Sequence, residues 1–246
     1  MTAPYEKQFH IPASAVDRFD RLKPSHILDY MQEVAGDHSA LLGLSRQALT
    51  DRGLFWAVIR HKVQITRLPK AGENITVKTW PMPTTRTAYP RSTIVYDEQG
   101  QECLRAISLW VLMDRNTRAM VLPGKSGVTV DGLLLGSELA APGSIVPREL
   151  CNAMERRVLF TDLDWNGHMN NCRYLDWAMD LLPGDFHQQR SVTGFTVCYL
   201  SEAKEADTLQ LQWELSDGPC ISVNGLRKDS DVSAGHSRVF AAQMQF

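Results

Sequence analysis

Polar side chains in residues 164–171 are the groups in this sequence best suited to chemistry. Asp164, Asn166 and His168 occupy alternate positions, which would place all three on one side of an extended segment. A carboxylate can take a proton from water, and a histidine can donate or accept a hydrogen bond near neutral pH. The run precedes a predicted helix, whose first N–H groups could hold a carbonyl oxygen as it gains negative charge. These residues therefore have the groups for acid–base work on a carbonyl compound.

A structural role is the alternative for the same run, because Asp and Asn also cap helices and accept turn conformations. A comparable run in the first half of the chain argues against it. That run reads Asp17-Arg18-Phe19-Asp20-Arg21, with Phe19 where Asn166 stands and Arg21 where His168 stands. A purely structural cap would be kept in both halves, so the difference favours a chemical role.

A second candidate is the charged turn from Tyr199 to Glu205, which contains Glu202. Taken alone, such a turn is a solvated loop. It gains weight only from the family resemblance described below.

Two predicted helices occupy corresponding places in the two halves. Pro24 and Ser25 open the first, which Gly43 can close; Asn170 and Asn171 can cap the second, which Pro183-Gly184 ends. Leu28-Asp29-Tyr30 in the first matches Leu175-Asp176-Trp177 in the second. Apolar residues recur at helical spacing in both: Ile27, Leu28, Met31, Val34, Ala35 and Leu42, then Tyr174, Leu175, Trp177, Ala178 and Leu181.

Each helix is preceded by one predicted strand and followed by four, all rich in β-branched and aromatic residues. This order predicts an α+β fold in which each half packs a helix on an antiparallel sheet. The predicted strands are 5–11, 55–65, 74–80, 89–96 and 103–113 in the first half, and 155–160, 192–200, 208–215, 220–226 and 237–246 in the second.

The segment between the halves has the composition of a linker, because eight of the residues from Leu122 to Glu149 are Gly or Pro. We therefore expect an N-terminal domain at 1–130, a linker at 131–147 and a C-terminal domain at 148–246.

Composition excludes several classes of function. The formal net charge of -2 gives no general attraction to nucleic acid or anionic lipid. The longest stretch without a charged residue, Ser191 to Ser201, is far shorter than the roughly 18 apolar residues of a membrane helix. Residues 1–15 lack the layout of a signal peptide, so we expect a cytoplasmic protein without membrane contact. The five cysteines form no C-x-x-C pair, which fits free thiols and gives no zinc signature.

The run from Asp164 to Tyr174 resembles the Asp-x-Asn-x-His-x-Asn-Asn-x-x-Tyr signature of acyl-acyl-carrier-protein (acyl-ACP) thioesterases. These plant and bacterial enzymes are tandem pairs of hot-dog domains, each a long central helix wrapped by an antiparallel sheet. The resemblance covers nearly the whole chain. Tyr30 to Ala35 is similar to the family's first-helix pattern, and Leu109 to Asp114 to one of its strands.

The resemblance implies four catalytic residues, namely Asp164, Asn166, His168 and Glu202. Plant members often carry a cysteine directly after the glutamate, whereas this chain has Ala203 there, so a Cys-His mechanism at that position is excluded. Cys198 lies four residues upstream, about 13 Å away along a strand, and reads as a small buried residue.

The resemblance also implies the activity, which is hydrolysis of acyl-ACP to free fatty acid, ending fatty acid synthesis. An acyl-coenzyme A thioesterase and a non-catalytic acyl-binding protein are the alternatives, and a homodimer stays open. By analogy with the family, the acyl tail enters the first half, where Met31, Val34, Ala35 and Leu42 would form the pocket wall. No cofactor or metal is expected.

Acyl carrier protein is acidic, so a basic docking patch is expected. One group of candidates lies in the first half, and further ones are scattered: Arg60, His61, Lys62, Arg67 and Lys70, then Arg86, Arg91, Arg156 and Arg157.

Overall fold

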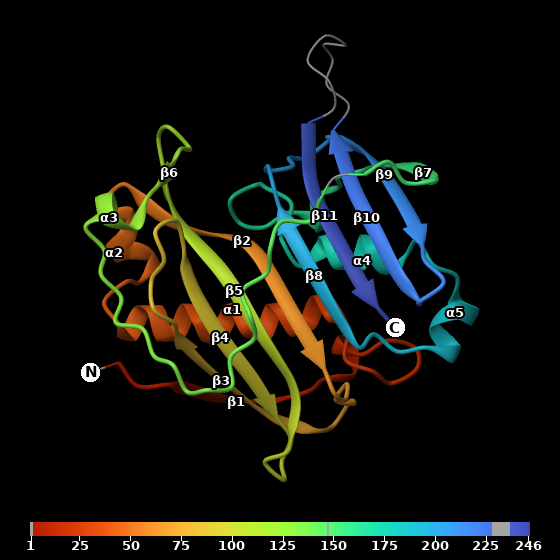
Figure 1. The fold of residues 1–246 in the computed structure, drawn as a ribbon, viewed down its shortest axis with the longest axis horizontal. Helices are drawn as coiled ribbons and strands as arrows, with labels where there is room; N and C mark the ends of the chain where they lie inside the picture. The colour runs from red at the N-terminus through yellow and green to blue at the C-terminus, as the bar shows by residue number, and fades with distance from the viewer. Residues whose placement is uncertain (1, 147, 228–236) are drawn as a thin grey trace. The chain divides into compact units, whose positions relative to one another are not determined.

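The computed structural model describes residues 2–146, 148–227 and 237–246 (Figure 1). It divides into two compact units, Met1–Pro142 and Gly143–Phe246, which are described separately below. The division falls inside the segment expected as a linker. Among the described residues, no helix is long and apolar enough to cross a membrane.

The first unit is an antiparallel sheet with a long helix across one face (Figure 1). The strand order is β1-β3-β4-β5-β2, and the short β6 pairs with β5. Every strand predicted from sequence in this half is present. The bounds are β1 (Tyr5–His10), β2 (Leu54–Ile65), β3 (Asn74–Pro81), β4 (Tyr89–Tyr96), β5 (Glu102–Asp114) and β6 (Met120–Val121).

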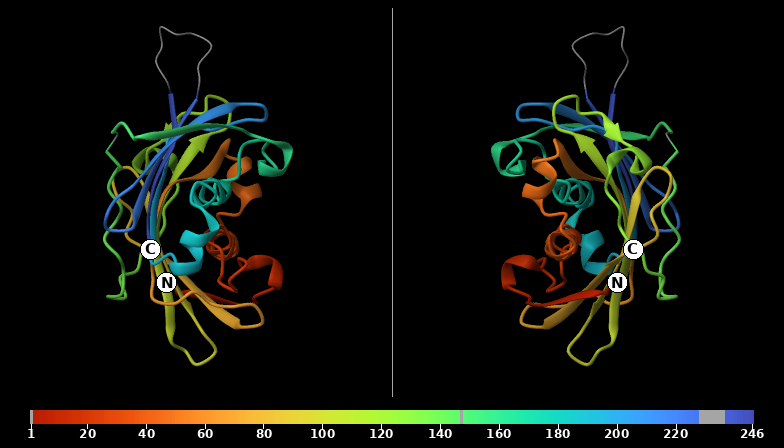
Figure 2. Two further views of the ribbon diagram at one scale, coloured as in Figure 1. Left: turned by 90° about the vertical axis from the view of Figure 1, so that its right-hand side faces the viewer. Right: turned by 90° about the vertical axis from the view of Figure 1, so that its left-hand side faces the viewer.

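Helix α1 (Pro24–Leu41) begins with proline at its first position, where a missing N–H costs nothing. Its buried residues Ile27, Met31, Val34 and His38 follow the helical repeat, so they form one stripe. Gly43 follows with a φ of 75°, a conformation that glycine adopts without strain. The side views of Figure 2 show the helix on one side of its sheet.

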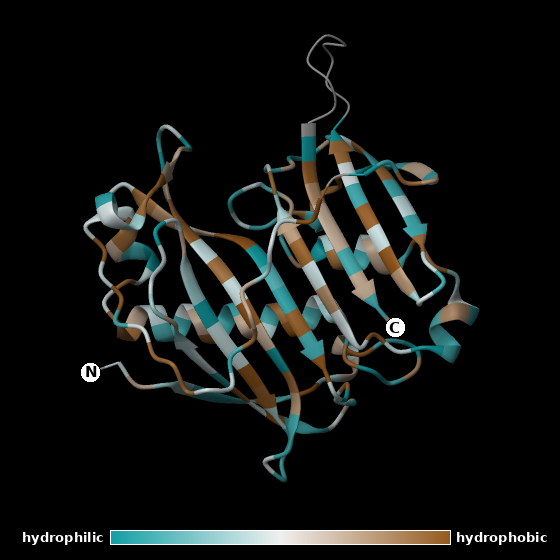
Figure 3. Ribbon diagram, in the orientation of Figure 1, coloured by the Kyte–Doolittle hydropathy of each residue, from teal (hydrophilic) through white to brown (hydrophobic). Residues whose placement is uncertain are grey.

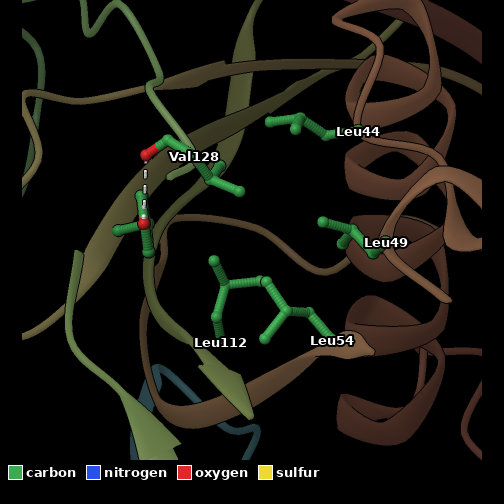
Figure 4. Close-up of a cluster of buried hydrophobic side chains, with 6 residues drawn as sticks. Leu44, Leu49, Leu54, Leu112 and Val128 are labelled. Atoms are coloured by element: carbon green, nitrogen blue, oxygen red, sulfur yellow. Dashed lines mark hydrogen bonds between the residues drawn. The ribbon is translucent and has the colours of Figure 1, made fainter. Parts of the chain in front are cut away.

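A compact apolar cluster fills the space beyond the end of α1, where α2 (Arg46–Thr50) packs on β2. Leu49 and Leu112 are fully buried in it, and each such side chain contributes roughly 1.5–3 kcal/mol. Figure 4 draws the cluster and labels all of its members except Tyr89, namely Leu44, Leu49, Leu54, Leu112 and Val128.

Strand β4 is buried on both faces, because residues 133–142 run over the outer face of this sheet. The Trp80 indole donates to Glu138 at 3.2 Å, and Arg105 donates to the Ser137 carbonyl at 3.0 Å. A Cβ at Gly132 would lie 2.1 Å from the Pro83 nitrogen, so only glycine fits this close approach. Most of the expected linker is thus bound to the first unit. Other strands alternate polar and apolar bands (Figure 3).

The second unit repeats the plan with strand order β8-β11-β10-β9-β7. Its elements are β7 (Asn152–Arg157), α4 (Arg173–Met179), α5 (Gly184–Gln189), β8 (Gly194–Tyr199), β9 (Thr208–Leu215), β10 (Cys220–Arg227) and β11 (Ser237–Gln245). A four-residue helix α3 (Pro123–Ser126) precedes the unit in sequence.

Two details differ from the sequence prediction. The first strand ends at Arg157, because Phe160–Asp162 form a 3₁₀ turn rather than continuing it. Helix α4 has only seven residues, against eighteen in α1, and its N-cap is Cys172 rather than Asn170 or Asn171. Leu181 lies beyond its end, since the chain must leave the helical conformation before Pro183.

Candidate active site

Asp164 organises the loop between the 3₁₀ turn and α4. Its Oδ1 accepts hydrogen bonds from the backbone N–H of Asn166 at 2.8 Å and of His168 at 3.2 Å. Its own N–H donates to the His168 carbonyl at 2.7 Å, and Gly167 closes the turn with a φ of 76°. The segment is therefore a tight turn, not the extended segment in which alternation would place Asp164, Asn166 and His168 on one side. The hydrogen bonds that the Asp164 carboxylate accepts stabilise this sharp bend of the backbone.

The four predicted residues come together in two pairs. Asn166 Nδ2 donates to Asp164 Oδ2 at 3.2 Å, and His168 Nε2 lies 3.4 Å from Glu202 Oε2. Backbone contacts draw the two loops together, because the Met169 N–H donates to the Ala203 carbonyl at 2.8 Å. The side chains of His168 and Glu202 are 20% and 43% exposed, so solvent and substrate can reach them.

The turn that carries Glu202 is held by residues that sequence reasoning missed. Arg227 in β10 donates through Nη2 to the Glu202 carbonyl and through Nε to Asp207 at 3.1 Å. Asp207 also accepts from the Lys204 N–H at 3.0 Å. Nothing in the sequence marks Arg227, because only the folded sheet brings it to this turn.

Tyr174 supports the same turn from the helix side. It is buried against Tyr199 and Phe240, and burial raises the pKa of its phenol, opposed by a hydrogen bond with the backbone of Ala203. The neutral phenol therefore sits beside the residue that follows Glu202. The signal was present in the sequence, since Tyr174 closes the motif run.

Two of the N–H groups at the start of α4 already have acceptors within the preceding loop. The Cys172 N–H donates to Asn170 Oδ1 and the Arg173 N–H to the Asn170 carbonyl, both at 2.9 Å. These two donors are thus satisfied within the loop. Asn171 next to them has a buried side-chain nitrogen without an acceptor in the described part of the chain.

Cys198 is buried in β8, and its sulfur lies 3.9 Å from the Gly143 carbonyl oxygen. This placement fits a small interior residue. Within the described ranges, no group of three or more His, Cys, Asp or Glu could hold a metal ion.

The residues expected to bind the substrate lie in the first unit. Met31, Val34 and Ala35 are buried on α1, whereas Leu42 follows the helix and is partly exposed. Two of the expected docking residues were wrong, because His61 and Arg91 are buried in the interior.

The other basic candidates differ in how they are engaged. Arg67 is paired with Glu73 and Asp97, and Arg156 with Asp180. Arg60 donates to the Pro142 carbonyl. The remaining four are exposed or partly exposed: Lys62, Lys70, Arg86 and Arg157.

Two family models match the chain. The model for the acyl-ACP thioesterase N-terminal domain matches residues 2–122, and that for the C-terminal domain matches residues 148–239. A chloroplast palmitoyl-acyl carrier protein thioesterase of Gossypium hirsutum is 24% identical over 208 residues, which cover 78% of this chain and 50% of that protein. An oleoyl-acyl carrier protein thioesterase of Arabidopsis thaliana is 23% identical, covering 83% and 62%. The chain spans about half the length of the first curated relatives it matches.

Solved structures confirm the fold class. An acyl-ACP thioesterase from Bacteroides thetaiotaomicron superposes with a TM-score of 0.84 at 23% identity, covering 99% of this chain and 97% of that one. A 12:0-ACP thioesterase from Umbellularia californica gives 0.81 at 21% identity, covering 98% and 96%. The chain thus has the tandem hot-dog architecture, α+β in class.

Proposed function

Because the chain belongs to the acyl-ACP thioesterase family, we propose that it hydrolyses the thioester between a fatty acyl chain and the phosphopantetheine arm of acyl carrier protein. The products are a free fatty acid and the carrier thiol. The observation that carries this proposal is the partly exposed His168–Glu202 pair, in which His168 belongs to the Asp164 turn that carries the family motif.

In this proposal Glu202 is the general base. Both oxygens of Asp164 already accept hydrogen bonds within its turn, whereas the Glu202 carboxylate is exposed beside an imidazole. Glu202 takes one proton from water as the water oxygen bonds to the thioester carbonyl carbon. The tetrahedral adduct collapses with cleavage of the carbon–sulfur bond. The proton passes from Glu202 through His168 to the leaving thiolate, and Asn166 orients the water.

The proposal places the acyl chain in the first unit, along the buried face of α1. Met31, Val34 and Ala35 support this, since an aliphatic chain is stabilised by apolar surface at about 25 cal/mol per Å². The acidic carrier would dock on basic groups left at the surface, for which Lys62, Lys70, Arg86 and Arg157 are the candidates.

The test is release of free thiol from matched ACP and coenzyme A esters with chains of eight to eighteen carbons. We expect faster hydrolysis of the ACP esters, and loss of it in Glu202→Gln. Equal or faster hydrolysis of the coenzyme A esters would assign the protein to that carrier instead. No hydrolysis of either ester would refute the enzymatic proposal.

A further inference from the structure

A row of polar side chains crosses the interior of the first unit, between its sheet and α1. Arg91 in β4 stands directly opposite Ser108 in β5, and Ser108 stands opposite His61 in β2. Residues paired in this way project from the same face of a sheet. Arg91 Nη1 lies 3.2 Å from His38 Nδ1 on α1, so this is the face toward the helix. We call His38, His61, Thr79, Arg91 and Ser108 the inner polar row.

Arg91 is the cation of this row, and it has only neutral partners. It is 8% exposed, and its Nη1 reaches His38 and, at 3.3 Å, Thr79 Oγ1. Burial and Arg91 lower the pKa of His38 to about 4, so this histidine is neutral at pH 7 and accepts the hydrogen bond. Burial lowers the pKa of Arg91 to about 10, which leaves the guanidinium charged. Among the described residues, no carboxylate pairs with Arg91, and its Nε and Nη2 make no hydrogen bond.

A buried charge without a counter-ion is costly, so proteins pair such groups or leave them for a ligand. Nε and Nη2 form the edge of a guanidinium that binds a carboxylate through two parallel hydrogen bonds. Arg105 in the same sheet uses these two atoms, which donate to the two carboxylate oxygens of Glu102 at 2.5 Å each. The corresponding edge of Arg91 therefore fits a carboxylate.

The inner polar row interrupts the apolar surface along which the acyl chain is proposed to lie. His38 stands on α1 between Ala35 and Leu42. On the sheet, the Val95–Leu104 pair lies on one side of Arg91, and the Tyr89–Trp110 pair lies on the other. A chain that follows this wall from Val95 toward Tyr89 meets Arg91 before it reaches the apolar cluster around Leu49 and Leu112.

We propose that Arg91 binds a carboxylate at the far end of an aliphatic chain inside the first unit. The inference rests on the proposed function for the placement of the chain. The carboxylate has two sources. It belongs either to a substrate that carries a second carboxyl group at its far end, or to a free fatty acid bound with its carboxylate inward.

The first experiment measures binding by calorimetry at pH 7.5, with decanoate and the matched neutral decan-1-ol as probes. The wild type should bind decanoate at least tenfold more tightly than decan-1-ol. Arg91→Met should abolish this difference, and Arg105→Met, a control with the same change of charge on the sheet, should preserve it. Equal affinity of the two probes in the wild type, or a preference that persists in Arg91→Met, would overturn the proposal and leave ordered water as the partner of Arg91.

Folding should not limit this test, because Arg91→Met removes a buried charge that has no counter-ion and puts an apolar side chain of similar length in its place. If Arg91→Met does not fold, Arg91→Gln keeps the polarity and removes the charge. Binding needs no turnover, so the result stands even if the thioesterase proposal fails.

A second measurement identifies the source once binding is established. It compares kcat/KM for decanoyl-ACP with that for the ACP ester of decanedioic acid. A wild-type preference for the dicarboxylic ester that falls at least tenfold in Arg91→Met identifies a substrate carboxylate. An unchanged ratio identifies the free fatty acid.

Discussion

The two units contain the same turn, and only one of them carries the groups proposed to be catalytic. In the first unit, Asp17 Oδ1 accepts from the N–H of Phe19 at 2.8 Å and of Arg21 at 3.1 Å. The Asp17 N–H donates to the Arg21 carbonyl at 2.8 Å. Asp164 makes the equivalent three bonds in the second unit. The aspartate carboxylate thus stabilises the backbone conformation of both turns.

The partner loops also correspond, which aligns a third position. The Leu22 N–H donates to the Pro69 carbonyl as the Met169 N–H donates to the Ala203 carbonyl. Leu68 therefore occupies the place of Glu202. Of the four predicted site positions, three differ between the units, and they pair as Asn166 with Phe19, His168 with Arg21 and Glu202 with Leu68. The difference shows that the amide, the imidazole and the glutamate distinguish the second unit, and that the aspartate does not.

The largest expected effect comes from Glu202, where the two units differ by a carboxylate. Glu202→Gln keeps the shape and removes the base, so kcat should fall about a thousandfold, within the range for general bases. Thiol release from acyl-ACP measures it. Glu205→Gln, an exposed carboxylate in the same turn, is the control and should keep full activity. Activity within tenfold of the wild type in Glu202→Gln would remove this residue from the mechanism.

Asp164→Ala and Asp17→Ala test the shared framework. Each variant removes equivalent hydrogen bonds, so the free energy of unfolding should fall by about 1–2 kcal/mol in both. Only Asp164→Ala should also lower kcat, though by less than Glu202→Gln, because only that turn positions His168. Denaturant melts and kcat on the same samples give both quantities. If Asp17→Ala lost activity to the same extent, the catalytic groups would not be confined to the second unit.

The sequence predicted the strands well because they depend on local periodicity. The bounds of β4 and β9 agree with the prediction to the residue, and α1 begins at its expected proline. Helix α4 was less predictable, because the packing of Asn170 and Cys172 in the preceding turn decides where it begins. Local patterns carry no information on such a choice.

The site was predictable as a motif, but its geometry was not. The alternation of polar residues was argued for an extended segment, whereas one carboxylate with two N–H partners bends the loop into a turn. A purely structural cap is expected in both halves. Asp164 fulfils this expectation, because Asp17 is its counterpart and makes the equivalent hydrogen bonds. The sequence offers Arg91 as a docking candidate, because a sequence does not show which face of a fully buried strand carries a charge.

The two units should also differ in their response to acid. Burial lowers the pKa of His38 to about 4 and of His61 to about 3, both in the first unit. In the unfolded chain these histidines titrate near pH 6.5, at roughly the usual value. Between about pH 6.5 and 4 the unfolded state binds protons that the folded state does not. The free energy of unfolding therefore decreases as the pH is lowered through this range.

Hydrogen exchange, corrected for the intrinsic pH dependence of the rates, can locate this loss. We expect β4 and β5 to lose protection between pH 7 and 4.5, and β10 to keep it. His38→Gln, which cannot take up a proton, should reduce the loss. Equal loss of protection in both units would mean that carboxylates rather than buried histidines control the acid response.

The smallest effect concerns a single backbone conformation in the two turns. Gly72 and Ala206 are equivalent, since their N–H groups donate to the carbonyls of Ile11 and Val158, and their φ angles are 84° and 69°. A Cβ at positive φ costs about 1 kcal/mol. Ala206→Gly should therefore stabilise the protein by up to about 1 kcal/mol. Gly72→Ala should destabilise it by about the same amount. Only the backbone strain contributes there, because a Cβ at Gly72 would meet no other atom within 4 Å. Neither change touches the catalytic pair, so kcat should stay constant. A stabilising Gly72→Ala in denaturant melts would show that the turn relaxes to another conformation.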